Sequence, residues 1–321
     1  MINYQIYKFS RLIGKFKKKA IVRAKRPMTN EIFISELSRE IGTNYNPTLV
    51  ISIDDISFKK KSFICSENGG TINSNLVKSL SDLLTWGIRP TLYFVPNPIF
   101  AYQADSSFKT RHDYSVSSDE FSDALAYYKE IESKGLIEFC QHGLTHFNEK
   151  LNGYHSFEYD FLSGDEIKEK IAFGFYLIRD KFDISGFKPP AWSIGQLSGT
   201  ENVFLNSINS LGFFKYVSLS SPNNGLNYTT KKVSHCFLTD VLGMVNVPQN
   251  VSLLWPLDFS YRVIDLIIEK GGCINIQLHF QESSKYMLDG FSKENLSKLK
   301  RIFDYALHKG ATHVLTKNLL Q

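Results

Sequence analysis

Short apolar runs alternate with amphipathic stretches along the chain from residue 48 onwards. The apolar runs have the usual length of buried strands and predict strands at 49–56, 91–95, 136–140, 216–219, 244–247, 273–278 and 312–315. Between them, apolar residues recur at helical spacing and predict helices at 74–86, 119–134, 165–182, 201–212, 260–270 and 292–308. This repeated strand-then-helix order predicts an α/β fold with a parallel sheet, either open or closed into a barrel.

The first part of the chain has a different pattern, and we expect an arm at 1–46 followed by one barrel at 47–321. Apolar residues with alternating spacings of four and three predict one stripe of a helix, formed by Ile2, Ile6, Phe9, Ile13, Phe16 and Ala20. Nine Lys and Arg residues precede the first acidic residue, Glu31, in a chain of net charge +5, so the remainder is net negative. The pattern predicts a basic amphipathic helix that contacts an anionic membrane through residues 1–26. A helix packed on the barrel or a solvated tail stays open as an alternative, and we expect no nucleic acid partner because no recognition motif accompanies the charge.

Composition narrows the class of protein. A chain of 321 residues with 43% hydrophobic residues is long enough and apolar enough for a large core, which excludes a disordered chain. The four cysteines form no CxxC pair, so a reducing compartment is expected. No stretch approaches the roughly 18 apolar residues of a membrane span, and residues 1–30 lack the apolar block of a signal peptide. We therefore expect a cytoplasmic protein, with the arm as a means of peripheral attachment to the inner membrane face.

Three of the predicted strands are followed by residues that can perform chemistry. Asp54 and Asp55 end the first strand, His142 and His146 follow the third, and His279 ends the strand at 273–278. The carboxyl ends of parallel strands meet at one rim, so these side chains are expected together. One carboxylate and two imidazoles suit Zn²⁺ or a similar divalent ion with an open position. A second carboxylate can take a proton from water and a histidine can protonate a leaving group, which predicts a metal-dependent acyl hydrolase.

Four segments together resemble the motifs of the polysaccharide deacetylase superfamily (NodB homology, carbohydrate esterase family 4), especially its divergent deacetylase-like branch. Ser52–Ile56 matches the family's Thr-Phe-Asp-Asp-Gly, and His142–His146 matches its His-Ser/Thr-x-x-His. Phe187–Trp192 loosely matches Arg-Pro-Pro-aromatic-Gly, and Leu278 with His279 matches the last motif, Leu-His. The order and the wide spacing agree over about residues 48–316.

The resemblance implies an irregular (β/α)7 barrel of the glycoside hydrolase and deacetylase type that removes N- or O-acetyl groups from sugars. It implies Asp54 as general base and His279 as general acid. The implied ligands of one divalent metal ion are Asp55, His142 and His146. Zn²⁺ is the first expectation for that ion, with Co²⁺, Ni²⁺ or Mn²⁺ as alternatives. An acetylated sugar or glycoconjugate is the implied substrate.

The third motif implies a substrate-binding side of the site formed by Lys188, Ala191 and Trp192. The backbone N–H of Ala191 would help to bind the oxyanion, and the ring of Trp192 could stack on a sugar or plug the barrel mouth. Lys188 stands where the family has an arginine that braces the catalytic Asp, so the support here is a point charge rather than a fork. Ile56 replaces the glycine of the first motif.

Other readings stay open at this point. The barrel could bind glycans without turnover, or hydrolyse a non-sugar amide with the same metal centre. An Fe(II) oxygenase also uses two His and a carboxylate, but a base–acid pair would be idle there. Asp240 and Asp258 are both candidate partners for His279, and Cys140 is interpreted as a buried small hydrophobe rather than a soft metal ligand.

Overall fold

The computed structural model describes most of the predicted barrel. The described residues are 30–40, 46–56, 74–96, 122–146, 148, 158–192, 194–195, 198–219, 236–279 and 289–320. The predicted amphipathic helix at 2–20, the segment 1–26 that is expected to contact a membrane and the predicted loop at 97–118 therefore lie outside the described residues, as does most of the loop at 147–162.

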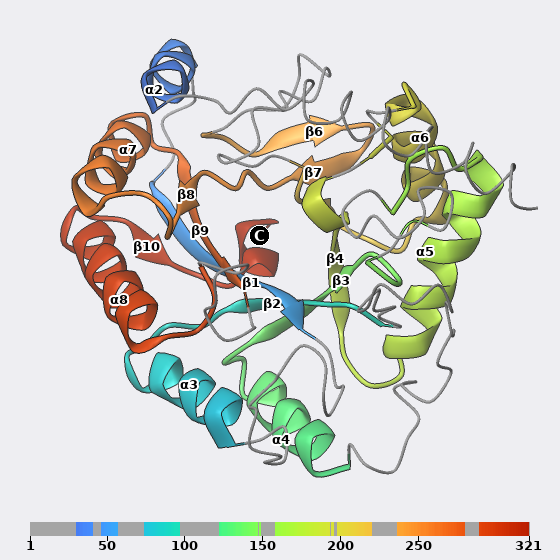
Figure 1. Ribbon diagram of the computed structural model, residues 1–321, viewed down its shortest axis with the longest axis horizontal. Coiled ribbons are helices and arrows are strands. Elements are labelled where there is room, and N and C mark those ends of the chain that lie inside the picture. Colours follow the sequence, from blue (N-terminus) through green and yellow to red (C-terminus); the bar gives the residue numbers. More distant parts are fainter. Residues whose placement is uncertain are drawn as a thin grey trace, which may run out of the picture.

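The described strands form one sheet that curves into a barrel (Figure 1). The strands are β1 (Thr48–Ile56), β2 (Thr91–Phe94), β3 (Glu138–His142), β4 (Ile184–Lys188), β5 (Tyr216–Val217), β6 (Thr239–Val241), β7 (Met244–Asn246), β8 (Val251–Ser252), β9 (Cys273–His279) and β10 (Thr312–His313). Their order is β6-β7-β5-β4-β3-β2-β1-β9-β8, with β10 beside the start of β1. All neighbouring pairs are parallel except β6 with β7. The predicted irregular β/α barrel is confirmed.

Helices surround the sheet on its outer side (Figure 1). They are α2 (Asn30–Arg39), α3 (Ser74–Thr85), α4 (Ser122–Ser133), α5 (Gly164–Ile178), α6 (Glu201–Leu211), α7 (Leu257–Glu269) and α8 (Lys293–His308). Two short 3₁₀ helices, η4 (Pro190–Trp192) and η5 (Thr316–Leu320), lie after β4 and at the end of the described chain. A capping box begins α5: the backbone N–H of Glu166 donates to the Ser163 side chain, and the backbone N–H of Ser163 donates to the Glu166 side chain.

The two faces of the strands have different surroundings. On β1, Leu49, Ile51 and Ile53 face the helices and belong to the large hydrophobic core. The alternate residue Val50 belongs to a small separate cluster with Tyr93, Cys140, Tyr216, Val247 and Cys273. Because successive strand residues point to opposite faces, this second cluster lies inside the barrel, and the polar side chains in phase with it point inward as well.

The apolar pattern missed strand β4 because two of its inward-facing residues are not apolar side chains. In β4, Gly186 faces the ring of Tyr216, and a Cβ atom at Gly186 would lie 2.2 Å from Tyr216 Cζ. Lys188 is inward-facing and completely buried. Neither residue contributes to an apolar run, so β4 was not among the predicted strands, and neither were the two- and three-residue strands β8 and β6. The seven predicted strands are present, with shifted ends.

Residues 30–40, within the predicted arm, pack against the barrel. Phe33 and Leu37 of α2 are buried, and the ring of Phe33 lies 5.3 Å from that of Trp255. Lys270 Nζ donates to the carbonyl oxygens of Ser38 (3.1 Å) and Glu40 (2.6 Å). This part of the segment 1–46 therefore contributes to the core of the barrel.

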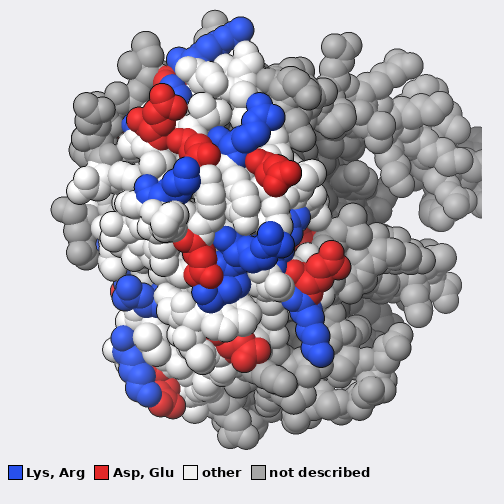
Figure 2. Space-filling view, turned by 90° about the vertical axis from the view of Figure 1, so that its left-hand side faces the viewer, with Lys and Arg blue, Asp and Glu red and all other residues white. Residues whose placement is uncertain are grey.

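The outer face that includes α7 and α8 has interspersed charges of both signs (Figure 2). Lys300 pairs with Asp304 and Lys309 with Asp265 on this face. Such exposed pairs contribute little to stability, and their mixture gives this face no single sign of charge. Within the part of the chain that the structure describes, no helix combines the length and the apolar character needed to cross a membrane.

Candidate metal centre

The strand ends bring the predicted site residues to one rim of the barrel. Asp54 pairs in register with His279 on the neighbouring strand β9. Further along the sheet, where β3 lies beside β4, His142 pairs in register with Lys188. His146 lies in the turn that follows β3. Residues from 54 to 279 in the sequence thus meet because parallel strands end at a common edge.

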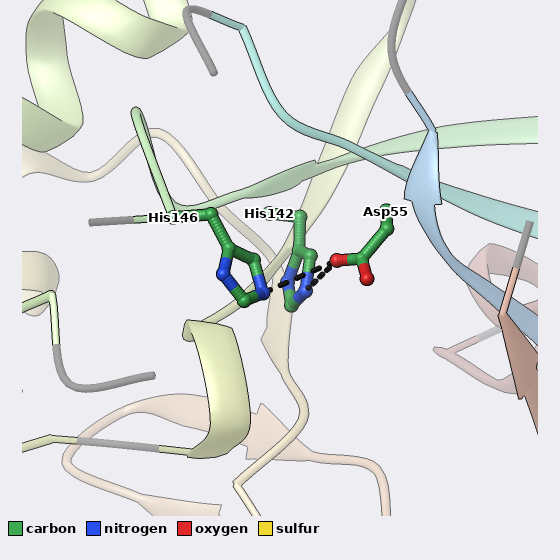
Figure 3. Close-up of side chains that lie close together, drawn as sticks. All are labelled: Asp55, His142 and His146. Atoms are coloured by element: carbon green, nitrogen blue, oxygen red, sulfur yellow. Dashed lines mark ion pairs between the residues drawn. The ribbon is translucent and has the colours of Figure 1, made fainter. Parts of the chain in front are cut away.

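Three of these side chains form a group that can hold a metal ion. Asp55 Oδ1 lies 3.3 Å from His142 Nε2 and 3.2 Å from His146 Nε2 (Figure 3). Ligand atoms of the three residues all lie within 4.8 Å of one another. Asp55 and His142 are buried, and His146 is partly exposed.

The donor chemistry fits a divalent ion. One carboxylate oxygen and two imidazole nitrogens are the ligand types of catalytic zinc sites with an open position. His142 Nδ1 lies 3.0 Å from the carbonyl oxygen of Lys188, so Nδ1–H donates there and Nε2 is the atom that can bind metal. Without metal, burial raises the pKa of Asp55, but the neighbouring histidines outweigh it and hold that pKa well below its ordinary value. Burial would lower the pKa of His146, but Asp55 raises it above the ordinary value.

Backbone strain is concentrated at this group. Asp55 has φ 61°, His146 has φ 57° and Trp192 has φ 53°, all in the left-handed region that non-glycine residues rarely adopt. The register of β1 against β2 shifts between Ile53 and Ile56, where Asp55 turns out of the regular ladder. Residues held in this conformation cost of order 1–3 kcal/mol each and cluster at functional sites.

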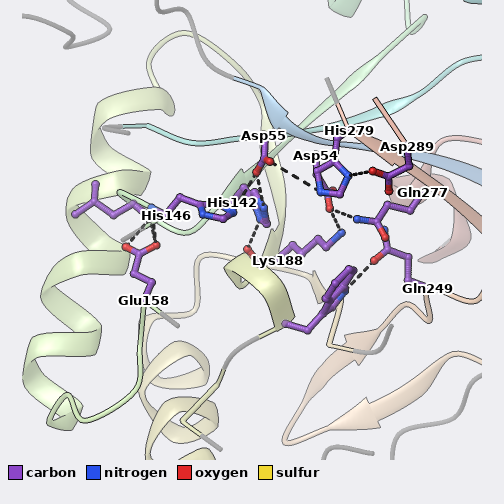
Figure 4. A network of polar contacts seen from close by, with 12 residues as sticks. Asp54, Asp55, His142, His146, Glu158, Lys188, Gln249, Gln277, His279 and Asp289 are labelled. Atoms are coloured by element: carbon purple, nitrogen blue, oxygen red, sulfur yellow. Dashed lines mark hydrogen bonds and ion pairs between the residues drawn. The ribbon is translucent and has the colours of Figure 1, made fainter. Parts of the chain in front are cut away.

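Asp54 lies next to Asp55 on β1 and accepts hydrogen bonds from two side chains. Lys188 Nζ and Gln277 Nε2 both donate to Asp54 Oδ2, the latter at 2.6 Å (Figure 4). The ammonium of Lys188 also lies 4.6 Å from the ring centre of Trp192 and 5.3 Å from that of Tyr93. Lys188 is thus a buried cation between one carboxylate and two aromatic faces.

His279 has a partner that the sequence reasoning did not identify. Its Nδ1 lies 3.0 Å from Asp289 Oδ1, and its Nε2 lies 3.9 Å from Asp55 Oδ2 (Figure 4). The two candidate partners, Asp240 and Asp258, are wrong: both are exposed, in the β6–β7 hairpin and the first turn of α7. Burial would lower the pKa of His279, but the hydrogen bond to Asp289 and the charge of Asp55 raise it to about 9 in the metal-free protein.

Lys188, Ala191 and Trp192, the predicted substrate-binding residues, lie at the end of β4 and in η4. Trp192 is 7% exposed, and its Nε1 donates to Gln249 Oε1 (2.8 Å), so the ring has a fixed orientation beside Lys188. Ala191 lies in the same short helix, directly after β4. Lys188 is buried and contacts Asp54. Contact of these three residues with a substrate stays a prediction.

Three residues of the site were missed by sequence reasoning. Gln277 lies two residues before His279 on the same strand face, so the period of two could have found it. Asp289 and Glu158 lie in connections between elements, where no periodicity indicates which way a side chain points. Cys140, by contrast, is buried lower in the barrel, with Sγ 2.7 Å from Tyr216 Oη and away from the metal group, as its interpretation as a small buried residue requires.

Comparison with known proteins agrees with this geometry at the level of the fold. No protein-family model and no curated protein sequence matches the chain. Among solved structures, a protein of Mycobacterium smegmatis assigned as a polysaccharide deacetylase resembles it with 11% identity, 87% of this chain and 92% of that chain covered, and a TM-score of 0.50. This is the fold of the polysaccharide deacetylases.

Other solved deacetylase structures are similar to the chain. A chitin deacetylase from the fungal pathogen Colletotrichum lindemuthianum has 10% identity, covers 87% of this chain and 89% of its own, and has a TM-score of 0.48. A mutant of a carbohydrate esterase family 4 pseudoenzyme has 12% identity, 87% and 69% coverage and a TM-score of 0.45. The match to the Mycobacterium smegmatis structure confirms the predicted resemblance to the superfamily at the level of the fold.

Proposed function

We propose that this protein is a metal-dependent hydrolase that removes an acetyl group from a sugar or glycoconjugate. The observation that supports it best is the convergence of Asp55, His142 and His146 in a barrel of deacetylase fold, with Asp54 and His279 beside them. A metal group, a second carboxylate and a histidine form the minimal set for acyl hydrolysis.

Asp55, His142 and His146 would hold the ion, Zn²⁺ in the first place. A divalent ion there would make water more acidic and polarise the acyl carbonyl. The tautomer of His142 is suited to this role because Lys188 O accepts from Nδ1 and directs Nε2 to the group.

Asp54 is proposed to take the proton from the attacking water. Its Oδ2 accepts from Lys188 and Gln277, which fixes the carboxylate, while its Oδ1 is buried and has no hydrogen-bond partner among the described residues. The orientation of a base by second partners is a recurring requirement in proton transfer. One oxygen of Asp54 is therefore anchored and the other is available.

His279 is proposed to protonate the leaving amine or alkoxide. Asp289 holds Nδ1, so Nε2 is directed toward Asp55 and the metal group. The same pairing favours the protonated imidazolium, which is the form that an acid must have before it acts. We propose further that the backbone N–H of Ala191 contacts the oxyanion and that the ring of Trp192 contacts the sugar.

Membrane contact through residues 1–26 is supported only by their charge pattern.

The first experiment measures metal content. Wild type, His146→Ala and the control His308→Ala, an exposed histidine on α8, are dialysed against trace Zn²⁺ and analysed by elemental mass spectrometry. We expect about one equivalent in wild type and control and little in His146→Ala, because the third ligand is lost. Acetate release is then measured over acetylated sugars and a non-sugar acetamide.

The outcomes separate the candidate functions. Release from sugars supports the deacetylase, and release from the simple amide alone would indicate an amidase. One equivalent of metal without release from any substrate would favour a glycan-binding barrel. Absence of metal from wild type would contradict the hydrolase mechanism.

A further inference from the structure

The turn that connects His142 to His146 is built around a carboxylate from elsewhere in the chain. Three consecutive backbone N–H groups donate to Glu158: Leu144 (3.0 Å to Oε1 and 3.2 Å to Oε2), Thr145 (3.0 Å to Oε1) and His146 (3.0 Å to Oε2). Figure 4 shows Glu158 beside His146. Thr145 Oγ1 donates to Oε1 as well, at 3.2 Å. Successive N–H groups that converge in this way form an anion-binding concavity, and here the anion is the chain's own side chain.

The turn closes tightly on this carboxylate. Glu158 is completely buried. Gly143 has φ 62°, and a Cβ atom at that position would lie 2.2 Å from Glu158 Oε2 and 2.6 Å from Pro190 Cγ. A side chain at position 143 would collide with both neighbours, so the turn can close around this carboxylate only with glycine there.

The two histidines of the metal group differ in what holds them. His142 is a residue of β3, paired in register with Lys188 and fixed through Nδ1 by a carbonyl oxygen. His146 lies beyond the strand with φ 57°, a conformation that histidine adopts only where its surroundings impose it. Its backbone N–H donates to Glu158 Oε2, and this hydrogen bond helps to hold the left-handed backbone of the residue.

We propose that Glu158 is the positioning residue of the metal group and sets the metal affinity through His146. The carboxylate holds the left-handed turn, which directs His146 Nε2 to within 3.2 Å of Asp55 Oδ1. Its buried negative charge also lies next to a group that gains positive charge when metal binds. This inference rests on the proposed metal-binding function, and it adds a requirement outside the three ligands. Removal of partners that orient metal ligands typically costs 10–100-fold in affinity.

The test compares Glu158→Gln with wild type and with Glu166→Gln. Gln keeps the size of the side chain but replaces one acceptor oxygen with an NH₂ group that faces N–H donors. Glu166 is a matched control, because it also accepts a backbone N–H, from Ser163, but lies at the start of α5. Zn²⁺ affinity is measured on folded protein by competition with a chromophoric chelator, and the ligand-field absorption of bound Co²⁺ reports the geometry of the ligands.

We expect Glu158→Gln to bind Zn²⁺ 10–100-fold more weakly than wild type, with an altered Co²⁺ spectrum, and Glu166→Gln to match wild type. A purely structural role would instead lower the melting temperature of the metal-free protein and leave affinity and spectrum unchanged, which would overturn the inference. If wild type itself binds no metal, the proposed function and this inference both fail. If wild type binds and Glu158→Gln binds equally well, only this inference fails.

A second variant covers the case in which Glu158→Gln does not fold. Thr145→Val removes the hydroxyl that donates to Glu158 and keeps the three backbone donors. We expect a weakening of Zn²⁺ binding in the same direction, by a factor of about 2–5, which corresponds to one hydrogen bond. Unchanged affinity in this folded variant would overturn the inference.

Discussion

Two buried carboxylates point into the same barrel, and their surroundings are opposite. Glu138, at the amino end of β3, accepts hydrogen bonds on both oxygens: from Ser185 Oγ (2.6 Å) and Tyr216 Oη (2.7 Å) on Oε1, and from Thr91 Oγ1 (3.2 Å) and Lys317 N (3.0 Å) on Oε2. Lys317 belongs to η5, which lies across the barrel near its axis in Figure 1. This carboxylate is saturated, and it fastens the base of the barrel to the last described residues.

Asp54, at the opposite end, has both of its donors on one oxygen. Around it lie a buried lysine, three residues with left-handed backbone and a group of metal-binding type. Buried polar residues lie at both ends of the strands, so polarity inside the barrel does not by itself distinguish a reactive carboxylate from a structural one. The distinction lies in which acceptor positions the protein fills and which it leaves for a ligand.

The largest expected effect is at Asp54. Asp54→Asn keeps the shape and one acceptor oxygen for Lys188 but removes the base, so acetate release should fall about 10³-fold. Bound Zn²⁺ should stay at the wild-type level, because Asp54 is outside the three-residue metal group. Steady-state kinetics and metal analysis on the same preparation check both parts, with the exposed Asp258→Asn as control. Loss of metal in Asp54→Asn would mean that Asp54 is itself a ligand.

The next effect tests the saturated carboxylate. Glu138→Ala leaves buried hydroxyl and N–H donors without an acceptor, so it should lower the free energy of unfolding by about 3 kcal/mol. The metal affinity of the folded protein should be unchanged, because the site lies at the other end of β3. Urea unfolding and Zn²⁺ titration measure the two quantities. Cys140→Ala, on the same strand face, is a suitable control with a smaller expected loss, and a Glu138 variant with weakened metal binding would break the contrast between the two ends.

The smallest effect depends on pH. In the metal-free protein the pKa of His279 is raised to about 9, so the protonated form contributes stability below the unfolded pKa of about 6.5, and this is lost as pH rises to about 9. Asp289→Asn removes the negative charge that pairs with His279, so it should lower the free energy of unfolding near pH 6. The loss should be at most roughly 3 kcal/mol, and solvent around the partly exposed His279 reduces it further. The measurement is urea unfolding with chelator at pH 6 and 9.5. If the difference in unfolding free energy between wild type and Asp289→Asn grows from pH 6 to pH 9.5, Asp289 is not the partner that raises the pKa of His279.

Sequence reasoning found the parts of the site that are tied to strand ends. Asp54, Asp55, His142 and His279 follow or end apolar runs, and parallel topology brings such ends together. Lys188, which contacts Asp54, was found by its place in a family motif and not by an apolar run. Strand β4 forms no apolar run because it presents a glycine and a lysine to the interior.

The supporting residues could not be predicted in the same way. Glu158 and Asp289 reach the site from connections, and a hydrogen bond between a side chain and a distant turn leaves no periodic trace in the sequence. The position of residues 30–40 is a similar case, because a helix that docks on α7 and one that projects as an arm have the same amphipathic pattern.

The docking of α2 has a practical consequence for anyone who makes a shorter version of this protein. A version that begins at residue 47 would look complete by its sequence pattern, yet it would strip Phe33 and Leu37 from the core and leave the ring of Trp255 facing solvent. Lys270 would lose both carbonyl acceptors, and the backbone N–H of Cys236 would lose Glu40. Trimming for crystallisation or expression should therefore stop before Asn30.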